Sequence, residues 1–303
     1  MIVNTNRLSI LGIFLFSVIY VLTAEATENT APSPVIKKKS QRIISLGGDI
    51  TEIIYALDAE KQLVGVDTSS LWPESVKSLP QVGYFRALSA EGLISLSPDM
   101  LIMSDAAGPE SVLEQVESTG ISSVKIKTSK TAKGVIDKIN QVAIALSKPD
   151  AGITLNKKII SEFKQLKQSK KQWQQPPPRV VFLFSVSKGS LMVSGSNTAA
   201  NAMIEMAGGI NVVTEYSGYK PINNEALIAA SPDFILLTGN TLKMMGGLEK
   251  IINLPGLTLT PAARQKNIIV MDTLYLLGFG PRTGKAALEL SQQLHPETRE
   301  KTQ

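Results

Sequence analysis

The chain has 303 residues, 43% of them hydrophobic and 19% charged, and its 31 basic and 26 acidic side chains give a net charge of +5. This length suits two ordinary domains or one large one. Cysteine is absent, which excludes disulfide scaffolds, thiolate metal sites, cysteine nucleophiles and lipid attachment to a cysteine. The single histidine, His295, precedes a proline in a polar tail, where we expect a solvated side chain. Carriers of bare zinc or manganese, which want several histidines, are therefore excluded.

Residues 1–26 have the pattern of a cleaved export signal. Arg7 precedes an apolar run over 8–22, and Ala24-Glu25-Ala26 offers an A-x-A-like cleavage site. A membrane anchor is the competing interpretation, but the run is shorter than the ~20 residues that span a bilayer. Residues 27–40 predict a flexible leader. We therefore expect a periplasmic protein without stable membrane insertion.

Beyond residue 40, β-rich runs alternate with helical stretches, the pattern of α/β architecture. In the first part we predict a strand at 42–46, a helix at 51–57, strands at 62–66 and 100–104, a helix at 110–119, a strand at 123–127 and a helix at 132–146. Residues 150–174 show no strand pattern and predict one long helix, which ends before the prolines at 176–178.

The alternation then resumes. We predict a strand at 179–185, helices at 198–207 and 224–230, strands at 233–238 and 267–271, and a helix at 283–294. The predicted fold is α/β, with an N-terminal lobe over 41–148, an interlobe helix over 149–175 and a C-terminal lobe over 176–303. Basic residues are scattered and aromatic residues are only 5% of the chain, so we expect no nucleic-acid partner.

An internal repeat relates the two lobes. Glu91 to Asp99 reads EGLISLSPD, Glu225 to Asp233 reads EALIAASPD, and an apolar strand follows each copy. Ser-Pro-Asp alone is a common turn before a strand. It does not explain why a glutamate stands at the same distance before both aspartates, so we interpret the repeat as a duplication.

Gly47-Gly48 separates the first predicted strand from a helix whose first turn holds Asp49. Backbone N–H groups at such a helix start can bind an anion. A tight turn with Asp49 as the N-cap is the alternative. The glycine motifs of nucleotide sites are absent from the sequence, which disfavours a dinucleotide-binding enzyme.

Tyr84 and Arg86 are two residues apart in a segment that we expect to be an extended loop, so their side chains should point the same way. A guanidinium beside a phenol favours the phenolate, an oxygen donor suited to ferric iron and a known axial ligand of heme. Surface packing explains most such pairs, and the pair alone does not identify an iron site.

A set of motifs extends this observation over the chain. They are RIISLGGDITEIIYAL at 42–57, GYFRALSAEG at 83–92, MVSGSNTAA at 192–200, AGGIN at 207–211, GYKP at 218–221, LPGL at 254–257 and LLGFGPRT at 276–283. Together they resemble the periplasmic heme-binding proteins of bacterial heme ABC importers, within the long-helix class (class III) of substrate-binding proteins. The resemblance implies two α/β lobes joined by a single long helix. It also implies a monomeric carrier, not an enzyme, that delivers heme to an inner-membrane ABC permease.

The resemblance makes Tyr84 the axial iron ligand and places Arg86 beside it. Some relatives add a histidine from the second lobe, but the loop at 185–190 has Lys188 and no histidine. An arginine common near 238–242 is also absent, and Lys188, Lys220 or solvent are open candidates for its role. Tyr219 either lines the cleft or packs within its loop.

Arg282 and two glutamates complete the candidate residues. Three roles are open for Arg282: contact with the ligand, contact with the permease, or capping of the helix that follows. The resemblance assigns Glu91 and Glu225 to permease docking, whereas stabilisation of a helix start is the alternative for both.

Two other functions remain open from the sequence. A carrier of cobalamin or a ferric siderophore shares the architecture, although a cobalamin carrier has no need of the Tyr84 phenolate. An exported hydrolase would need a nucleophile–base pair, which the sequence does not offer.

Overall fold

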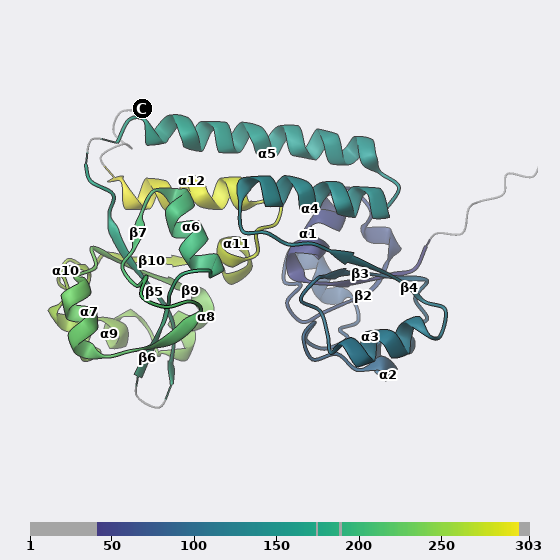
Figure 1. Ribbon diagram of the computed structural model, residues 1–303, viewed down its shortest axis with the longest axis horizontal. Helices are drawn as coiled ribbons and strands as arrows, with labels where there is room; N and C mark the ends of the chain where they lie inside the picture. The colour runs from purple at the N-terminus through teal and green to yellow at the C-terminus, as the bar shows by residue number, and fades with distance from the viewer. Residues whose placement is uncertain (1–40, 174, 188–189, 297–303) are drawn as a thin grey trace, which may run out of the picture. The chain divides into compact units, whose positions relative to one another are not determined.

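The computed structural model describes residues 41–173, 175–187 and 190–296, which build two α/β lobes, each around its own sheet (Figure 1). The first lobe contains β1 (Ile43–Leu46), α1 (Gly48–Ala56), β2 (Leu63–Val66), α2 (Ala90–Ile94), β3 (Met100–Ser104), α3 (Glu110–Glu117), β4 (Ser122–Ile126) and α4 (Ala132–Ala145). Helix α5 (Pro149–Lys170) then leads to the second lobe.

The second lobe begins with a long strand and ends with a long helix. It contains β5 (Arg179–Ser187), β6 (Ser190–Ser194), α6 (Ala199–Ala207), β7 (Ile210–Asn211), β8 (Tyr219–Ile222), α7 (Asn224–Ala230), β9 (Phe234–Thr238), α8 (Gly239–Met244), α9 (Leu248–Ile252), α10 (Pro261–Arg264), β10 (Ile268–Met271), α11 (Thr273–Leu277) and α12 (Thr283–Leu294). Short 3₁₀ turns occupy Glu60–Gln62, Glu74–Ser78 and Leu257–Leu259.

The sheet of the first lobe is parallel, in the order β2-β1-β3-β4. Strands β1 and β3 are buried along their whole length, as expected for central strands covered by helices on both faces. The sheet of the second lobe has the order β10-β9-β5-β6-β8, and β7 also pairs with β5. Its β10-β9-β5 part is parallel, and its β5-β6-β8 part is antiparallel. Ligands of open parallel sheets bind beyond the carboxyl ends of the strands, so these ends are where a site is expected.

The two lobes of the α/β prediction are confirmed, and most predicted elements match observed ones to within about three residues. Strands β6, β7 and β8 and helices α8 to α11 lie outside the predicted elements. They are short, and β8 contains Pro221, which is tolerated because β8 is an edge strand of its sheet. Pairing within the sheet, which no local pattern reveals, sets the three strands, and the four helices are only four to six residues long.

Helix α5 packs along α4 and α12, with Ile159 and Leu166 buried (Figure 1). It ends at Lys170, before the predicted end, because Trp173 turns inward and stacks on His295 with 3.9 Å between ring centroids. The expectation of a solvated histidine is wrong, since His295 is 1% exposed. No helix among the described residues is long and apolar enough to cross a membrane.

The two copies of the internal repeat share hydrogen bonds as well as residue types. The Arg42 N–H donates to the Asp99 carboxylate at 2.8 Å, and the Asp99 N–H donates to the Arg42 carbonyl at 2.8 Å. In the second lobe, Arg179 and Asp233 form the same two bonds at 2.8 and 2.7 Å. Equivalent residues therefore join the first strand of each lobe to the turn before a neighbouring strand, which supports a duplication.

The turns themselves also match. Ser97 and Ser231 both adopt left-handed backbone conformations, with φ of 46° and 41°. The guanidinium of Arg42 donates to the carbonyls of Leu96 and Ser97, and that of Arg179 donates to carbonyls of Ala230 and Ser231.

Replacing either repeat aspartate should weaken the fold to a similar extent. We expect Asp99→Ala and Asp233→Ala each to lower the free energy of unfolding by about 1–2 kcal/mol, the range for hydrogen bonds to a charged acceptor at a partly exposed site. Urea denaturation measures the loss. Asp137→Ala, which removes an exposed pair with Lys133 on α4, is the control and should cost about 0.3–0.5 kcal/mol. Unequal losses at the two repeat aspartates would contradict equivalent roles.

Candidate functional site

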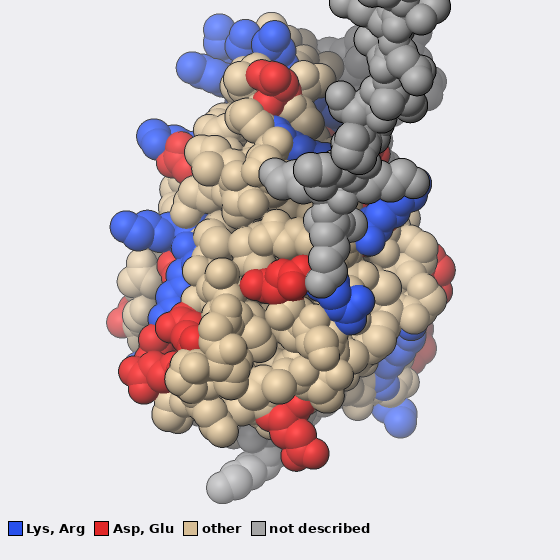
Figure 2. Space-filling model, turned by 90° about the vertical axis from the view of Figure 1, so that its right-hand side faces the viewer, with Lys and Arg blue, Asp and Glu red and all other residues tan. Residues whose placement is uncertain are grey.

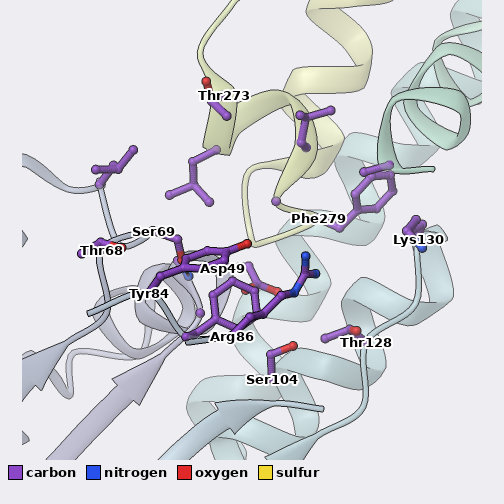
Figure 3. A pocket seen from close by; sticks show the side chains of 18 of the residues that line it. Asp49, Thr68, Ser69, Tyr84, Arg86, Ser104, Thr128, Lys130, Thr273 and Phe279 are labelled. Carbon is purple, nitrogen blue, oxygen red and sulfur yellow. Dashed lines mark hydrogen bonds between the residues drawn. The ribbon is translucent and has the colours of Figure 1, made fainter. Parts of the chain in front are cut away.

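A cavity of about 530 Å³ lies at the carboxyl ends of the strands and is lined by both lobes (Figure 3). The first lobe contributes the segments after β1, β2 and β4 and the last residue of β3. The second lobe contributes Ala199, Asn240 and the segment at 273–279. The volume lies within the ~300–1,000 Å³ typical of small-molecule sites.

Tyr84 and Arg86 both line this cavity and point into it from one turn (Figure 3). The expected extended loop is wrong, because the Ala87 N–H donates to the Tyr84 carbonyl at 2.8 Å and closes a tight turn. The intervening Phe85 ring packs edge-on against Tyr84 at 4.9 Å and lies beneath the Arg86 guanidinium, also at 4.9 Å. Phe85 itself packs on the core of the first lobe, so the core fixes the direction of both polar side chains.

The cavity combines apolar walls with unneutralised positive charge. Leu71, Leu274, Leu277 and Phe279 form apolar parts of its wall. Arg86 and Lys130 are exposed there, and neither takes part in an ion pair among the described residues. Such a lining suits a large apolar ligand that carries negative groups at its edge.

A second lysine in the lining, Lys138, is engaged in contacts within the protein. The Lys138 ammonium is buried, forms an ion pair with Asp49 and donates to the Phe279 carbonyl at 3.2 Å. It therefore links α4 and α1 of the first lobe to the second-lobe wall of the cavity and supplies no free charge to a ligand.

The turn at Gly47-Gly48 also belongs to the lining, but its N–H groups are used within the protein. The Gly47 N–H donates to the Asp67 carboxylate at 2.9 Å, and the Gly48 N–H donates to the Ser69 hydroxyl at 3.0 Å. Gly47 is the N-cap residue of α1, and Asp49 lies inside the first turn. Thus Asp49 as N-cap is wrong, and the geometry does not favour an anion site at these two amides.

Tyr219 lies outside the residues that line the cavity. Its half-buried ring packs 4.7 Å from the Phe184 ring, and its hydroxyl hydrogen-bonds the Thr198 side chain and the Ala200 backbone. Burial raises the pKa of Tyr219 above the ordinary value for a phenol, so the phenolate form is disfavoured there. Of the two open interpretations, the packed one fits this geometry.

Lys220 and Arg282 are also absent from the cavity lining. Lys220 lies over the Tyr216 ring at 5.3 Å, and Lys188 falls outside the described residues. Arg282 occupies the N-cap position of α12 without a side-chain cap bond, and its guanidinium instead pairs with Glu52 of α1. Asn240, within 238–242, lines the cavity.

Sequence reasoning missed three lining residues of consequence, Lys130, Lys138 and Phe279. Phe279 lies within the LLGFGPRT motif, so a signal was present, and its left-handed φ of 53° marks an unusual position. Lys138 had no local signal, because nothing in a helical pattern distinguishes a buried lysine from a solvated one, and Lys130 is one exposed lysine among many. Among the described residues, no group of three or more His, Asp or Glu side chains could hold a metal ion.

Comparisons with known proteins agree with this arrangement. A family model described as periplasmic binding protein matches residues 43–274. The periplasmic heme-binding protein RhuT from Roseiflexus sp. RS-1 in apo form is 40% identical with a TM-score of 0.81, over 86% of this chain and 99% of that one. The periplasmic heme-binding protein HutB of Vibrio cholerae is 35% identical with a TM-score of 0.77, over 85% and 100%. The vitamin B12-binding protein of Vibrio campbellii (strain ATCC BAA-1116) is 26% identical over 68% of this chain and 74% of that protein.

The buried pair should be sensitive to the loss of one partner alone. Lys138→Met leaves the Asp49 carboxylate without its cation, and we expect the free energy of unfolding to fall by about 3 kcal/mol. Adding Asp49→Asn should restore most of that loss, because no uncompensated charge is then left. Lys130→Met, at an exposed lysine of the same cavity, should change stability by less than about 0.5 kcal/mol. Thermal or urea unfolding checks all three, and equal effects of the two lysine variants would contradict the assignment.

Proposed function

The chain belongs to the periplasmic binding protein family, and from this premise we propose that it is a heme carrier of a bacterial ABC importer. It binds ferric heme in the cavity between its lobes and delivers it to an inner-membrane permease. The observation that carries the proposal is the pair formed by Tyr84 and Arg86 in the cavity (Figure 3). The resemblance to two heme-binding proteins at 40% and 35% identity supports it.

Heme has a flat apolar ring, a central iron and two carboxylates at one edge, and the cavity offers a partner for each. Tyr84 is 44% exposed, and its phenol oxygen is the donor for ferric iron. Leu274, Leu277 and Phe279 supply an apolar wall for the ring. Arg86 and Lys130 are free cations for the propionates, with Arg86 suited to bidentate pairing.

We expect the protein to supply an iron ligand, a tyrosine, from one side of the heme only. Among the described lining residues of the second lobe, none carries an imidazole, phenol, amine or thioether. Tyr219 has its hydroxyl engaged elsewhere. We therefore propose a high-spin ferric heme with Tyr84 as its axial ligand.

A carrier of cobalamin or a ferric siderophore is the second candidate, and the vitamin B12-binding relative favours it. The lining argues for heme. The exposed phenol of Tyr84 can bind the ferric ion, and the guanidinium of Arg86, which forms no ion pair among the described residues, can bind an anionic group of the ligand. Cobalamin brings its own nitrogen ligands and needs neither group.

We propose further that the protein works in the periplasm as a monomeric carrier without enzymatic activity. The family assignment and the substrate-binding lipoprotein among its relatives support an extracytoplasmic role with an ABC transporter. The export signal over 1–26 and the leader over 27–40 lie outside the described residues and remain predictions.

Tyr84 should decide the optical spectrum of the complex. Titration of the mature protein with hemin should give a saturable high-spin spectrum with a tyrosinate charge-transfer band. Tyr84→Phe should abolish that band and raise Kd at least 10-fold, equal to about 1.4 kcal/mol. Tyr55→Phe, a tyrosine outside the cavity lining, should change neither. A wild-type spectrum of bis-histidine type, or cobalamin bound more tightly than hemin, would overturn the proposal.

Glu91 and Glu225 are the proposed docking residues for the permease. Each is the exposed second residue of its helix, α2 or α7, and forms no ion pair among the described residues. The helix starts are capped by other side chains, since Ser89 accepts from the Gly92 N–H and Asn223 accepts from the Ala226 N–H. The glutamates therefore make no cap hydrogen bond and keep only the helix-dipole term of ~0.3–1 kcal/mol.

The equivalent positions suit a partner with two-fold symmetry. The repeat places one carboxylate at the same point of each lobe, and an importer permease presents two related halves. Figure 2, which faces the first lobe, shows some acidic side chains near its lower edge, away from α5, and others higher on the same face. We propose that basic groups of the permease meet these two carboxylates.

Charge reversal separates docking from ligand binding. The double variant Glu91→Arg/Glu225→Arg should keep the hemin Kd within about twofold and lose at least 10-fold in stimulation of the permease ATPase. The matched control Glu114→Arg/Glu249→Arg reverses the same number of exposed helix charges, one per lobe, and should stimulate normally. Normal stimulation by the first pair, or a loss of hemin binding, would show that these glutamates do not dock the permease.

A further inference from the structure

The segment at 278–282, here called the strap, connects α11 to α12 and crosses from the second lobe onto α1 of the first. Its Phe279 lines the cavity, and the Leu274 and Leu277 side chains of α11 line it just before the strap begins. The strap therefore belongs to the second-lobe wall that faces Tyr84 and its turn (Figure 3).

Charged groups of the first lobe hold the strap at both ends. The Phe279 carbonyl accepts from the Lys138 ammonium at 3.2 Å. At the other end, the Arg282 guanidinium donates from Nε to the Glu52 carboxylate at 3.0 Å and pairs with its second oxygen. Asp49, the partner of Lys138, lies one turn before Glu52 on α1, so one face of one helix supplies both acids.

The Arg282 contact is buried and directional. Glu52 is 4% exposed, and the guanidinium lies over the rings of Trp72 and Tyr275, at 4.8 and 4.9 Å from their centroids. Bidentate pairing and stacking on aromatic rings are properties of arginine that lysine does not reproduce. Between the two anchors, a Cβ at Gly280 would lie 3.2 Å from the Glu52 carboxylate and 3.5 Å from the Asp49 Cα, so the strap approaches α1 closely.

The strap also holds an unfavourable backbone conformation. Phe279 has φ of 53°, a left-handed value that a bulky residue adopts only when its surroundings enforce it. Its surroundings are the core in which its side chain is 3% exposed, Lys138 on its carbonyl and the Arg282 pair three residues on. Loss of either anchor would let Phe279 relax and change the wall of the cavity.

We infer that Glu52 and Arg282 are positioning residues, which fix the gap between the Tyr84 turn and the Phe279 wall without touching the ligand. The gap sets how closely the second lobe covers a flat ligand held by Tyr84, and hence how slowly that ligand leaves. This role deepens the proposed heme carriage and rests on it for the identity of the ligand. The effect on the relative position of the lobes does not depend on heme.

Two variants test the inference. Arg282→Lys keeps the positive charge and loses the bidentate and stacked geometry, whereas Glu52→Gln keeps the shape and an acceptor and loses the charge. Arg264→Lys, the same change at an exposed arginine of α10, is the matched control. Because the chain has no cysteine, spin labels can be attached to Gln115→Cys on α3 and Glu249→Cys on α9 without background.

The expected result is a broader interlobe distance distribution, measured by pulsed EPR, in both Arg282→Lys and Glu52→Gln, and a wild-type distribution in Arg264→Lys. Hemin should dissociate about 10-fold faster from both variants, while the tyrosinate band from Tyr84 is retained. A lower Tm with unchanged distance and dissociation rate would reduce the pair to a structural role and overturn the inference. A broadened distribution with an unchanged dissociation rate would overturn its part in ligand retention. If the wild-type protein binds no hemin, the proposed function fails, and the distance measurement still decides whether the pair fixes the lobes.

Discussion

The burial of two acids on one face of α1 is the constraint on which the rest of the structure depends. Asp49 and Glu52 are covered by the second lobe only because a cation meets each of them, Lys138 from α4 and Arg282 from the strap. Burying an unpaired carboxylate would cost several kcal/mol, and the packing of the lobes brings Arg282 to Glu52, while Lys138 meets Asp49 within the first lobe. The cavity is what remains open beside this contact, where the carboxyl ends of the strands meet.

Much of the fold follows from local pattern, and the residues that carry it are apolar runs with clear ends. The runs in β1 and β3 are buried throughout, and α12 is predicted residue for residue. Pattern fails where distant parts of the chain decide. Trp173 ends α5 early by stacking on His295, and these two residues lie over a hundred positions apart. No window of sequence contains both partners.

The candidate site, too, contains some residues that the sequence predicts and others that only tertiary packing sets. The spacing of Tyr84 and Arg86 predicted that they point the same way, and both line the cavity, although the backbone that directs them is a turn and not an extended loop. Lys138 is the opposite case, because its amphipathic helix gives no sign that one lysine lies on the buried face. Only the position of Asp49 on another helix makes that lysine favourable, and tertiary packing sets that position.

Tyr219 resembles Tyr84 in its local sequence but lies outside the residues that line the cavity. Gly83-Tyr84 and Gly218-Tyr219 precede the capped helices that carry Glu91 and Glu225, and both glycines have left-handed φ, 96° and 84°. The Gly83 carbonyl accepts from the Thr68 N–H at 2.9 Å, and the Gly218 carbonyl accepts from the Gly195 N–H at 2.8 Å, so each glycine is held by a residue that follows a strand, β2 or β6.

What separates the two tyrosines is the chain that follows. Residues 84–87 close a turn that leaves the first phenol in the cavity, whereas Tyr219 enters β8 and its hydroxyl bonds Thr198 and Ala200 at the start of α6. An exposed phenol can exchange water for a metal ion, and a buried one with a raised pKa cannot do so without losing its partners. Tyr84 thus faces the cavity as a candidate ligand, and Tyr219 packs within the second lobe. The asymmetry of the site follows from a single turn.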